Sequence, residues 1–154
     1  MTLAQHLQAD MTAAMRERDE LRRDTLRMAI AALQRAAKDA RRDLAPDEEL
    51  TVLTREIRTR RESVEAYARG HRPDLAAREQ REIDVLQAYM PAQLGVDELD
   101  AMVRAAIEET GATSPRDLGR VMKVLAPRVR GRADGRMVNE RVALELGRRA
   151  VEAG

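Results

Sequence analysis

The sequence predicts an all-α protein, with an N-terminal helical bundle followed by a small three-helix C-terminal domain. Hydrophobic residues make up 44% of the 154 residues and charged residues 36%, a balance typical of a globular chain. There is no Phe and no Trp, so Leu, Val, Ile, Met and Ala must fill the core, and these residues suit packed helices better than a β-sandwich. Apolar residues recur at helical spacing and no segment alternates with period two, which predicts the absence of a sheet.

The first 42 residues predict two helices. Thr2 and Gln5 have the spacing of a capping box, and a stripe of apolar side chains follows them. The members of this stripe are Leu3, Leu7, Met11 and Met15. The charged segment at 16–20 separates this helix from a second one, which continues to about Arg42.

Two further helices are predicted before residue 92. Pro46 suits the first turn of the third helix, and Gly70 is expected to end that helix as a left-handed cap. Pro73 opens the fourth helix and Pro91 stops it. The side chains expected in the core are Leu50, Leu53, Ile57, Val64, Tyr67, Leu75, Ile83, Leu86 and Tyr89.

After a linker at roughly 90–96, three shorter helices are expected at about 97–110, 115–126 and 135–151. Gly111 caps the first of them, Ser114 and Pro115 start the second, and Asp134 caps the third. Their expected core side chains are Leu99, Met102, Val103, Ile107, Leu118, Val121, Met122, Leu125, Met137, Val138, Val142 and Leu146.

These elements predict a domain over residues 1–92 and a second domain over residues 93–154. A unit of the second domain's size buries only about 60% of its extended-chain surface. We therefore expect it to be marginal alone and to lean on the first domain.

The residue types argue against several kinds of chemistry. The chain has no Cys, which excludes disulfides, thiolate metal sites and thiol nucleophiles. His6 and His71 are isolated from any matching ligand or nucleophile, and no phosphate-binding loop or dinucleotide fingerprint occurs. Carboxylates have Arg at helical spacing, as in Glu56 with Arg60 and Glu65 with Arg69, which is typical of a solvated helix face. We predict no catalytic residues, no metal site and no cofactor.

The N-terminal segment has no apolar core long enough for a signal peptide, and no run of residues approaches the length of a membrane span. These observations predict a cytoplasmic location.

The net charge of +1 conceals two oppositely charged segments. Residues 116–141 carry eight basic residues against three acidic ones, a net charge of +5, and residues 97–109 carry one basic residue against five acidic ones, a net charge of −4. Basic side chains also recur along the second and third helices, where interleaved acids favour self-paired, solvated faces. They are Arg35, Lys38 and Arg42, then Arg55, Arg58 and Arg61. Because bases of a single strand stack on aromatic rings, which are scarce here, any nucleic acid would be recognised through its backbone and shape.

The stretch "PRVRGRADGRMVNERV" (127–142) has two interpretations. Gly131 can end one helix in the left-handed conformation and Asp134 can cap the next, so a ligand is not needed to explain the turn. A turn does not need four arginines, however, and Arg beside a helix N-terminus is suited to binding anions. The side chains concerned are Arg128, Arg130, Arg132 and Arg136. If Asp134 occupies the first amides of the helix, phosphate contact falls mainly to these side chains.

The chain resembles the YqeY-like proteins of the GatB/YqeY group. The resemblance is carried by "RRESVEAYARGHRPDLAAREQREIDVLQAYMPAQL" (61–94), "LGRVMKVLAP" (118–127), "GRADGRMVNERV" (131–142) and the N-terminal "MTLAQHLQADMTAAMRERD", in the order of the family. The chain has Met90 where Leu is usual, and Arg130 and Arg132 where Lys is frequent. Neither departure removes a charge or a core residue.

The resemblance implies an all-α fold whose small C-terminal domain is akin to the tail of the B subunit of glutamine-dependent tRNA amidotransferases, which helps hold the tRNA. A similar module occurs in some glutaminyl-tRNA synthetases. The resemblance adds Lys123 and Asn139 to the candidate RNA contacts and assigns Gly135, with Gly131 and Asp134, to the turn. No segment resembles the catalytic domains of those enzymes.

Three hypotheses for function follow. The first is a non-catalytic tRNA-binding accessory module for glutamine-dependent tRNA amidation or aminoacylation. The second is a protein-interaction module that docks on an amidotransferase or aminoacyl-tRNA synthetase, with the acidic face at 97–109 as the contact. The third is a component with carbon–nitrogen ligase activity that uses glutamine as amide donor.

Overall fold

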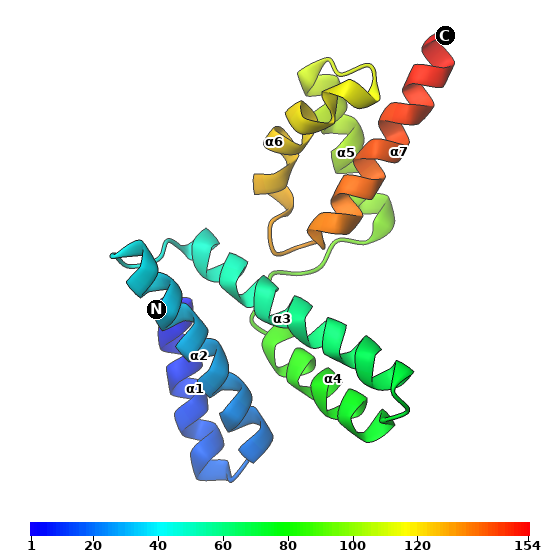
Figure 1. Ribbon diagram of the computed structural model, residues 1–154. Coiled ribbons are helices and arrows are strands. Elements are labelled where there is room, and N and C mark those ends of the chain that lie inside the picture. The colour runs from blue at the N-terminus through cyan, green and yellow to red at the C-terminus, as the bar shows by residue number, and fades with distance from the viewer. The chain divides into compact units, whose positions relative to one another are not determined.

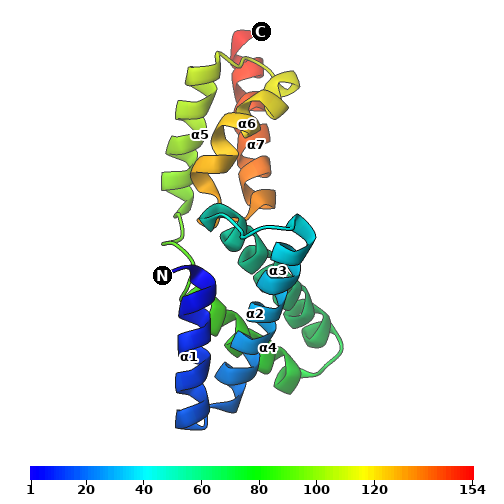
Figure 2. The ribbon, with the colours of Figure 1, turned by 90° about the vertical axis from the view of Figure 1, so that its left-hand side faces the viewer.

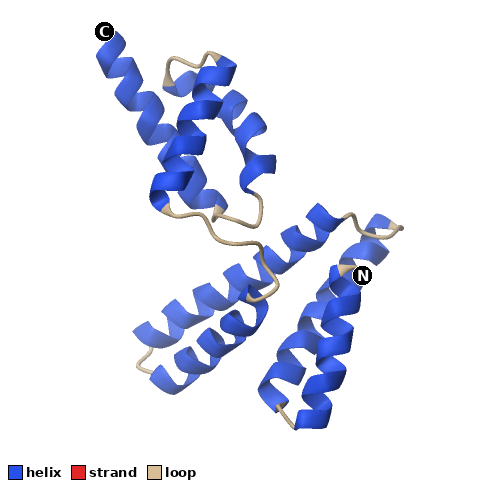
Figure 3. Cartoon of the chain, turned by 180° about the vertical axis from the view of Figure 1, so that it is seen from behind, coloured by secondary structure: helices blue, strands red, loops and turns tan.

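The computed structural model describes residues 1–154, which form seven α-helices and one short 3₁₀-helix and no strand (Figures 1 and 3). The all-α prediction is confirmed. The elements are α1 Leu3–Glu17, α2 Glu20–Ala40, α3 Pro46–Arg69, α4 Pro73–Gln87, α5 Val96–Thr110, η1 Pro115–Asp117, α6 Leu118–Val129 and α7 Gly135–Ala153. The chain divides into two compact units, Met1–Met90 and Pro91–Gly154. The predicted domain bounds, 1–92 and 93–154, and the expected dependence of the second domain on the first stay predictions.

Helices α1 and α2 form a hairpin whose ends are set by capping. The Thr2 hydroxyl accepts from the Gln5 amide at 3.2 Å and the Gln5 side chain accepts from the Thr2 amide at 2.9 Å, which confirms the capping box. Helix α1 ends at Glu17 because Arg18 takes the left-handed conformation (φ 59°), and Asp19 then caps α2 through the Arg22 amide. The charged segment thus separates two helices, as predicted.

Helices α3 and α4 form a second hairpin, seen beside the first in Figures 1 and 2. The expected left-handed cap at Gly70 is wrong: Gly70 has φ −84°, and His71 is left-handed with φ 57°. The helical path continues into Gly70, whose amide donates to the Ala66 carbonyl at 2.9 Å. The chain therefore reverses one residue later, where the Arg72 amide donates to the Tyr67 carbonyl at 2.9 Å.

The core of the N-terminal unit lies between α2 and the helices α1, α3 and α4 that contact it. Its buried apolar members are Leu7, Leu26, Ala29, Ile30, Leu33, Leu53, Ile57, Ile83 and Leu86. Met15, predicted as part of the apolar stripe, is 53% exposed, whereas Ala14 beside it in the last turn of α1 is fully buried. Two charged residues, Glu49 and Arg60, are buried as well.

In the C-terminal unit, α5, α6 and α7 pack around a core of their own (Figure 2). Its buried members are Leu99, Val103, Ala106, Ile107, Ala112, Val121, Leu125, Val129, Val138, Val142 and Leu146. Met137, expected in this core, is 42% exposed on the first turn of α7. Helix α6 also continues past the expected end at 126, because a proline at 127 removes one hydrogen bond near the end of the helix while burial of Val129 holds the last turn.

Candidate nucleic-acid interface

The turn between α6 and α7 is held in one conformation by its backbone. Gly131 is buried and has φ 75°, which a residue with a Cβ adopts only at a cost. The amides of Arg132 and Ala133 both donate to the Val129 carbonyl, at 2.8 and 3.2 Å. The chain therefore reverses direction immediately after α6.

Asp134 begins α7. Its carboxylate accepts from the Arg136 amide at 2.8 Å, so the first turn of the helix already has an anionic partner. Gly135 is the first residue of the helix, and a Cβ added there would meet nothing within 4 Å. The geometry of the turn thus depends on Gly131 and Asp134, and at Gly135 a larger residue would fit.

The segment before α5 is joined to this turn by two hydrogen bonds. The Gln93 side-chain amide donates to the Gly131 carbonyl at 2.8 Å, and the Leu94 amide donates to the Arg132 carbonyl at 2.8 Å. Gln93 and Leu94 lie in the segment 61–94, and Gly131 and Arg132 lie in the segment 131–142, and both segments resemble the family. Sequence reasoning missed this contact, because separation along the chain gave no sign that the two pieces meet.

Several arginines of the basic segment are paired with acids. Arg128 forms a bidentate pair with Glu109 at 2.7 and 2.9 Å, and the pair lowers the pKa of the Glu109 carboxyl group. Arg141 forms a second bidentate pair with Asp100, at 2.8 and 2.5 Å. Glu109 and Asp100 belong to the acidic segment, so the two oppositely charged segments neutralise each other in part within the unit.

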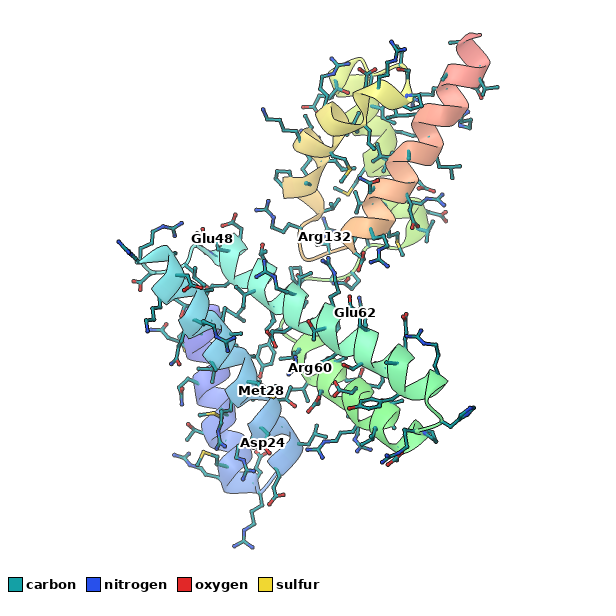
Figure 4. The ribbon with its side chains drawn as sticks, viewed as in Figure 1. Asp24, Met28, Glu48, Arg60, Glu62 and Arg132 are labelled. Atoms are coloured by element: carbon teal, nitrogen blue, oxygen red, sulfur yellow. The ribbon has the colours of Figure 1, made fainter.

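Three candidate cations form no ion pair in the structure. Lys123 on α6 and Arg136 on α7 are exposed, and Arg132, labelled in Figure 4, is half-buried in the turn. Arg130 and Asn139 are exposed. The turn brings Arg130, Arg132 and Arg136 together within seven residues, whereas Asn139 lies one turn into α7.

No helix is both long enough and apolar enough to cross a membrane. No cluster of three or more His, Asp or Glu side chains is arranged to hold a metal ion.

The chain is similar to three fungal proteins named "Altered inheritance of mitochondria protein 41, mitochondrial". It is 31% identical to the protein of Pyrenophora tritici-repentis over 147 residues, which cover 92% of this chain and 79% of that one. It is 30% identical to the proteins of Eremothecium gossypii and Lachancea thermotolerans, over 70% and 71% of this chain and 61% and 60% of theirs.

The mitochondrial names of these relatives overturn the expectation of a cytoplasmic location. That expectation used the lack of a long apolar stretch, which argues against a secretory signal peptide. Mitochondrial targeting segments are amphipathic and Arg-rich instead, so hydropathy gives no information about them.

The family described as Yqey-like protein matches residues 4–146, nearly the whole of both units. The chain therefore belongs to the family of Yqey-like proteins.

Proposed function

We propose that this protein is a non-catalytic accessory module that binds tRNA during glutamine-dependent tRNA amidation or aminoacylation. In this proposal the α6–α7 turn contacts the RNA backbone through Arg130, Arg132 and Arg136, with Lys123 beside them. The main support for this proposal is that Lys123, Arg132 and Arg136 form no ion pair, although most neighbouring arginines do. A cation without an acidic partner pays no cost of breaking a pair when it meets phosphate.

The rigidity of the turn supports this proposal. Hydrogen bonds from Gln93 and Leu94 fix the carbonyls of Gly131 and Arg132, so the arginines project from a backbone that is already ordered. Preorganised groups lose less entropy on binding than groups on a flexible loop. Arg128 has a lesser part in the proposal, because Glu109 competes with phosphate for its guanidinium group.

A titration of bulk tRNA at several salt concentrations tests the proposal. Each phosphate contact contributes about −0.7 to −0.9 to the slope of log affinity against log salt. The triple variant K123Q/R132Q/R136Q is expected to weaken binding and to reduce the magnitude of this slope by roughly 2 to 3. Filter binding gives both quantities.

The matched control is R16Q/R35Q/R58Q, which removes three exposed charges from the N-terminal unit and so changes net charge equally. It should retain the wild-type slope. Equal slopes for the triple variant and the wild type would exclude the α6–α7 turn as the contact.

A second candidate is the protein-interaction module that docks on an amidotransferase or aminoacyl-tRNA synthetase. The acidic segment at 97–109 is a weaker docking surface than its sequence suggests, because Asp100 and Glu109 are paired with arginines of the same unit. A different surface favours it: α7 exposes Met137, Leu144 and Val151 at intervals of seven residues, on one side of the helix. Co-purification of such an enzyme after nuclease treatment, without measurable tRNA affinity, would favour this candidate over the first.

A further inference from the structure

A cavity of about 410 Å³ lies among α2, α3 and α4 of the N-terminal unit. Its volume falls within the range of small-molecule sites, roughly 300–1,000 Å³. Thr59, Arg60 and Ser63 of α3 line it, and Arg60 is buried there, although charged side chains are rarely buried. Positions that break such a local rule are where functional sites are expected.

Arg60 is buried at the wall of this cavity and has unused hydrogen-bonding capacity. Its side chain is 5% exposed, and one terminal nitrogen donates to the Glu56 carbonyl and carboxylate, both at 3.1 Å. The other terminal nitrogen reaches only the Met28 sulfur, at 3.8 Å, which is a weak acceptor (Figure 4). Nε lies 3.5 Å from a Glu82 carboxylate oxygen but has no hydrogen-bond partner. Because sulfur is a weak acceptor, a ligand oxygen would be a favourable partner for the terminal nitrogen that reaches only Met28.

Two hydroxyl groups, those of Thr59 and Ser63, lie in the wall of the cavity. The Thr59 hydroxyl donates to the Arg55 carbonyl at 3.1 Å, and the Ser63 hydroxyl donates to the Thr59 carbonyl at 3.2 Å. Each hydroxyl group has one hydrogen, which these bonds use. Both side chains therefore remain as acceptors, which favours a ligand rich in N–H donors.

Two carboxylates, Glu79 and Glu82, lie three residues apart on α4 and complete the polar wall. Burial and the neighbouring Glu82 charge raise the pKa of the Glu79 carboxyl group. With Glu56 there are three carboxyl groups against the two guanidinium groups of Arg60 and Arg78, which gives a net charge of −1 when all three carboxyl groups are ionised. One positive charge would balance the cavity.

We propose that this cavity binds a small ammonium ion that carries a neutral oxygen acceptor, the chemistry of an amino-acid amide or ester. The ammonium group lies between Glu79 and Glu82 and donates to the hydroxyl oxygens, while the ligand oxygen accepts from Arg60. A zwitterionic amino acid fits less well, because its carboxylate leaves the net charge of −1 in place. An ammonium group next to a neutral carbonyl oxygen occurs in a free amino-acid amide and also at the N-terminus of a peptide. The probes below distinguish these two kinds of ligand.

Chemical-shift titration of the full, isotope-labelled chain tests the proposal with three matched probes: leucinamide, leucine and isopentylamine. Leucinamide has the charge and the oxygen, leucine is a zwitterion, and isopentylamine has the charge alone. Leucinamide is expected to shift the amide resonances of Thr59, Ser63 and Glu79 saturably and to bind more tightly than the other two. A Leu-Gly-Gly peptide that binds more tightly than leucinamide assigns the site to a peptide N-terminus.

Glu79→Gln should weaken leucinamide binding about tenfold, as expected for loss of a charge-assisted hydrogen bond. Glu62→Gln, an exposed charge-matched control on α3 (labelled in Figure 4), should leave it unchanged. Arg60→Lys should remove the preference for leucinamide over isopentylamine, and if that variant does not fold, the same preference in the wild type still tests the oxygen contact. Absence of saturable shifts, equal binding by Glu79→Gln and wild type, or tighter binding of leucine would overturn the proposal and leave Arg60 a purely structural residue.

Discussion

At the residue scale, two neighbouring glutamates on α3 serve the ends of two different helices. Glu48 accepts from the Ala45 amide at 2.8 Å and from both terminal nitrogens of Arg42 at 2.8 Å, which stabilises the start of α3 (Figure 4). Glu49 is buried and accepts from the Ala4 amide at 3.1 Å, which places a carboxylate at the start of α1. One turn of α3 therefore fixes the beginning of the hairpin that packs against it.

Glu48 predicts a specific loss of stability in acid. Hydrogen bonds from Arg42 and from the Ala45 backbone lower the pKa of Glu48 from 4.5 to about 2. Since the folded state has the lower pKa, its stabilising effect is complete above about pH 4.5 and is lost as the pH falls towards about 2. The slope of unfolding free energy against pH in this window should be smaller in Glu48→Gln than in wild type, as measured by urea denaturation. A slope unaffected by the substitution would contradict the prediction.

Arg60 shows where residue-level prediction from sequence stops. Its spacing from Glu56 predicts a solvated i, i+4 pair, and the pair is present at 3.1 Å, but Arg60 is buried. Spacing along one helix shows which side chains are neighbours on it. It does not show which face α2 and α4 cover, and that packing decides whether the pair meets water.

At the element scale, the helix ends that local chemistry specifies are the ones the sequence predicts. The capping box at Thr2, the left-handed Gly111 and the carboxylate of Asp134 each act within a few residues, so their spacing is sufficient to place α1, α5 and α7. The end of α6 at Val129 depends on burial in a core made by three helices, and the end of α3 depends on a reversal at His71. Such ends are set by tertiary packing and backbone geometry that spacing alone does not show.

The α3–α4 connection predicts opposite effects for two adjacent substitutions. His71 has φ 57°, so His71→Gly should relieve strain and increase the free energy of unfolding by up to about 1 kcal/mol. Gly70 has φ −84°, and a Cβ there would meet the Ala66 carbonyl oxygen at an ordinary 3.4 Å, so Gly70→Ala should be neutral or stabilising by about 0.5 kcal/mol. Thermal and urea denaturation measure both. A cost of about 1 kcal/mol for Gly70→Ala would instead place the left-handed residue at 70.

At the scale of the whole molecule, the chain builds two separate apolar cores. Leu26 and Leu53 lie in the first cluster and Leu125 and Val142 in the second, and all four are fully buried. The lack of Phe and Trp makes both cores aliphatic, so each depends on close packing of Leu, Ile, Val and Ala. The candidate RNA contacts all lie in the C-terminal unit and the cavity lies in the N-terminal one. Composition and periodicity predict the helical class, whereas the contact of Gln93 with Gly131 depends on a tertiary pairing that neither reveals.

Because each unit has a core of its own, a large-to-small substitution in one core should destabilise mainly the unit that contains it. Leu125→Ala should destabilise the C-terminal unit by about 2–5 kcal/mol and lower the hydrogen-exchange protection of α5–α7. Protection of α1–α4 should change by less than about 0.5 kcal/mol. Equal loss of protection in both units would show that they unfold as one. Leu26→Ala is the reciprocal variant: loss of protection in α5–α7 would show that the small unit leans on the larger one.

The hydrogen bonds from Gln93 and Leu94 also define where the chain can be divided. A fragment that starts at Val96 would contain all of α5–α7 and would lack both donors. The carbonyls of Gly131 and Arg132 would lose these hydrogen bonds, and the turn would be free to change conformation. A fragment that starts at Pro91 keeps both bonds. A fragment cut at the start of α5 would thus lose the hydrogen bonds that hold the α6–α7 turn. The C-terminal unit is better cut in the loop that precedes α5.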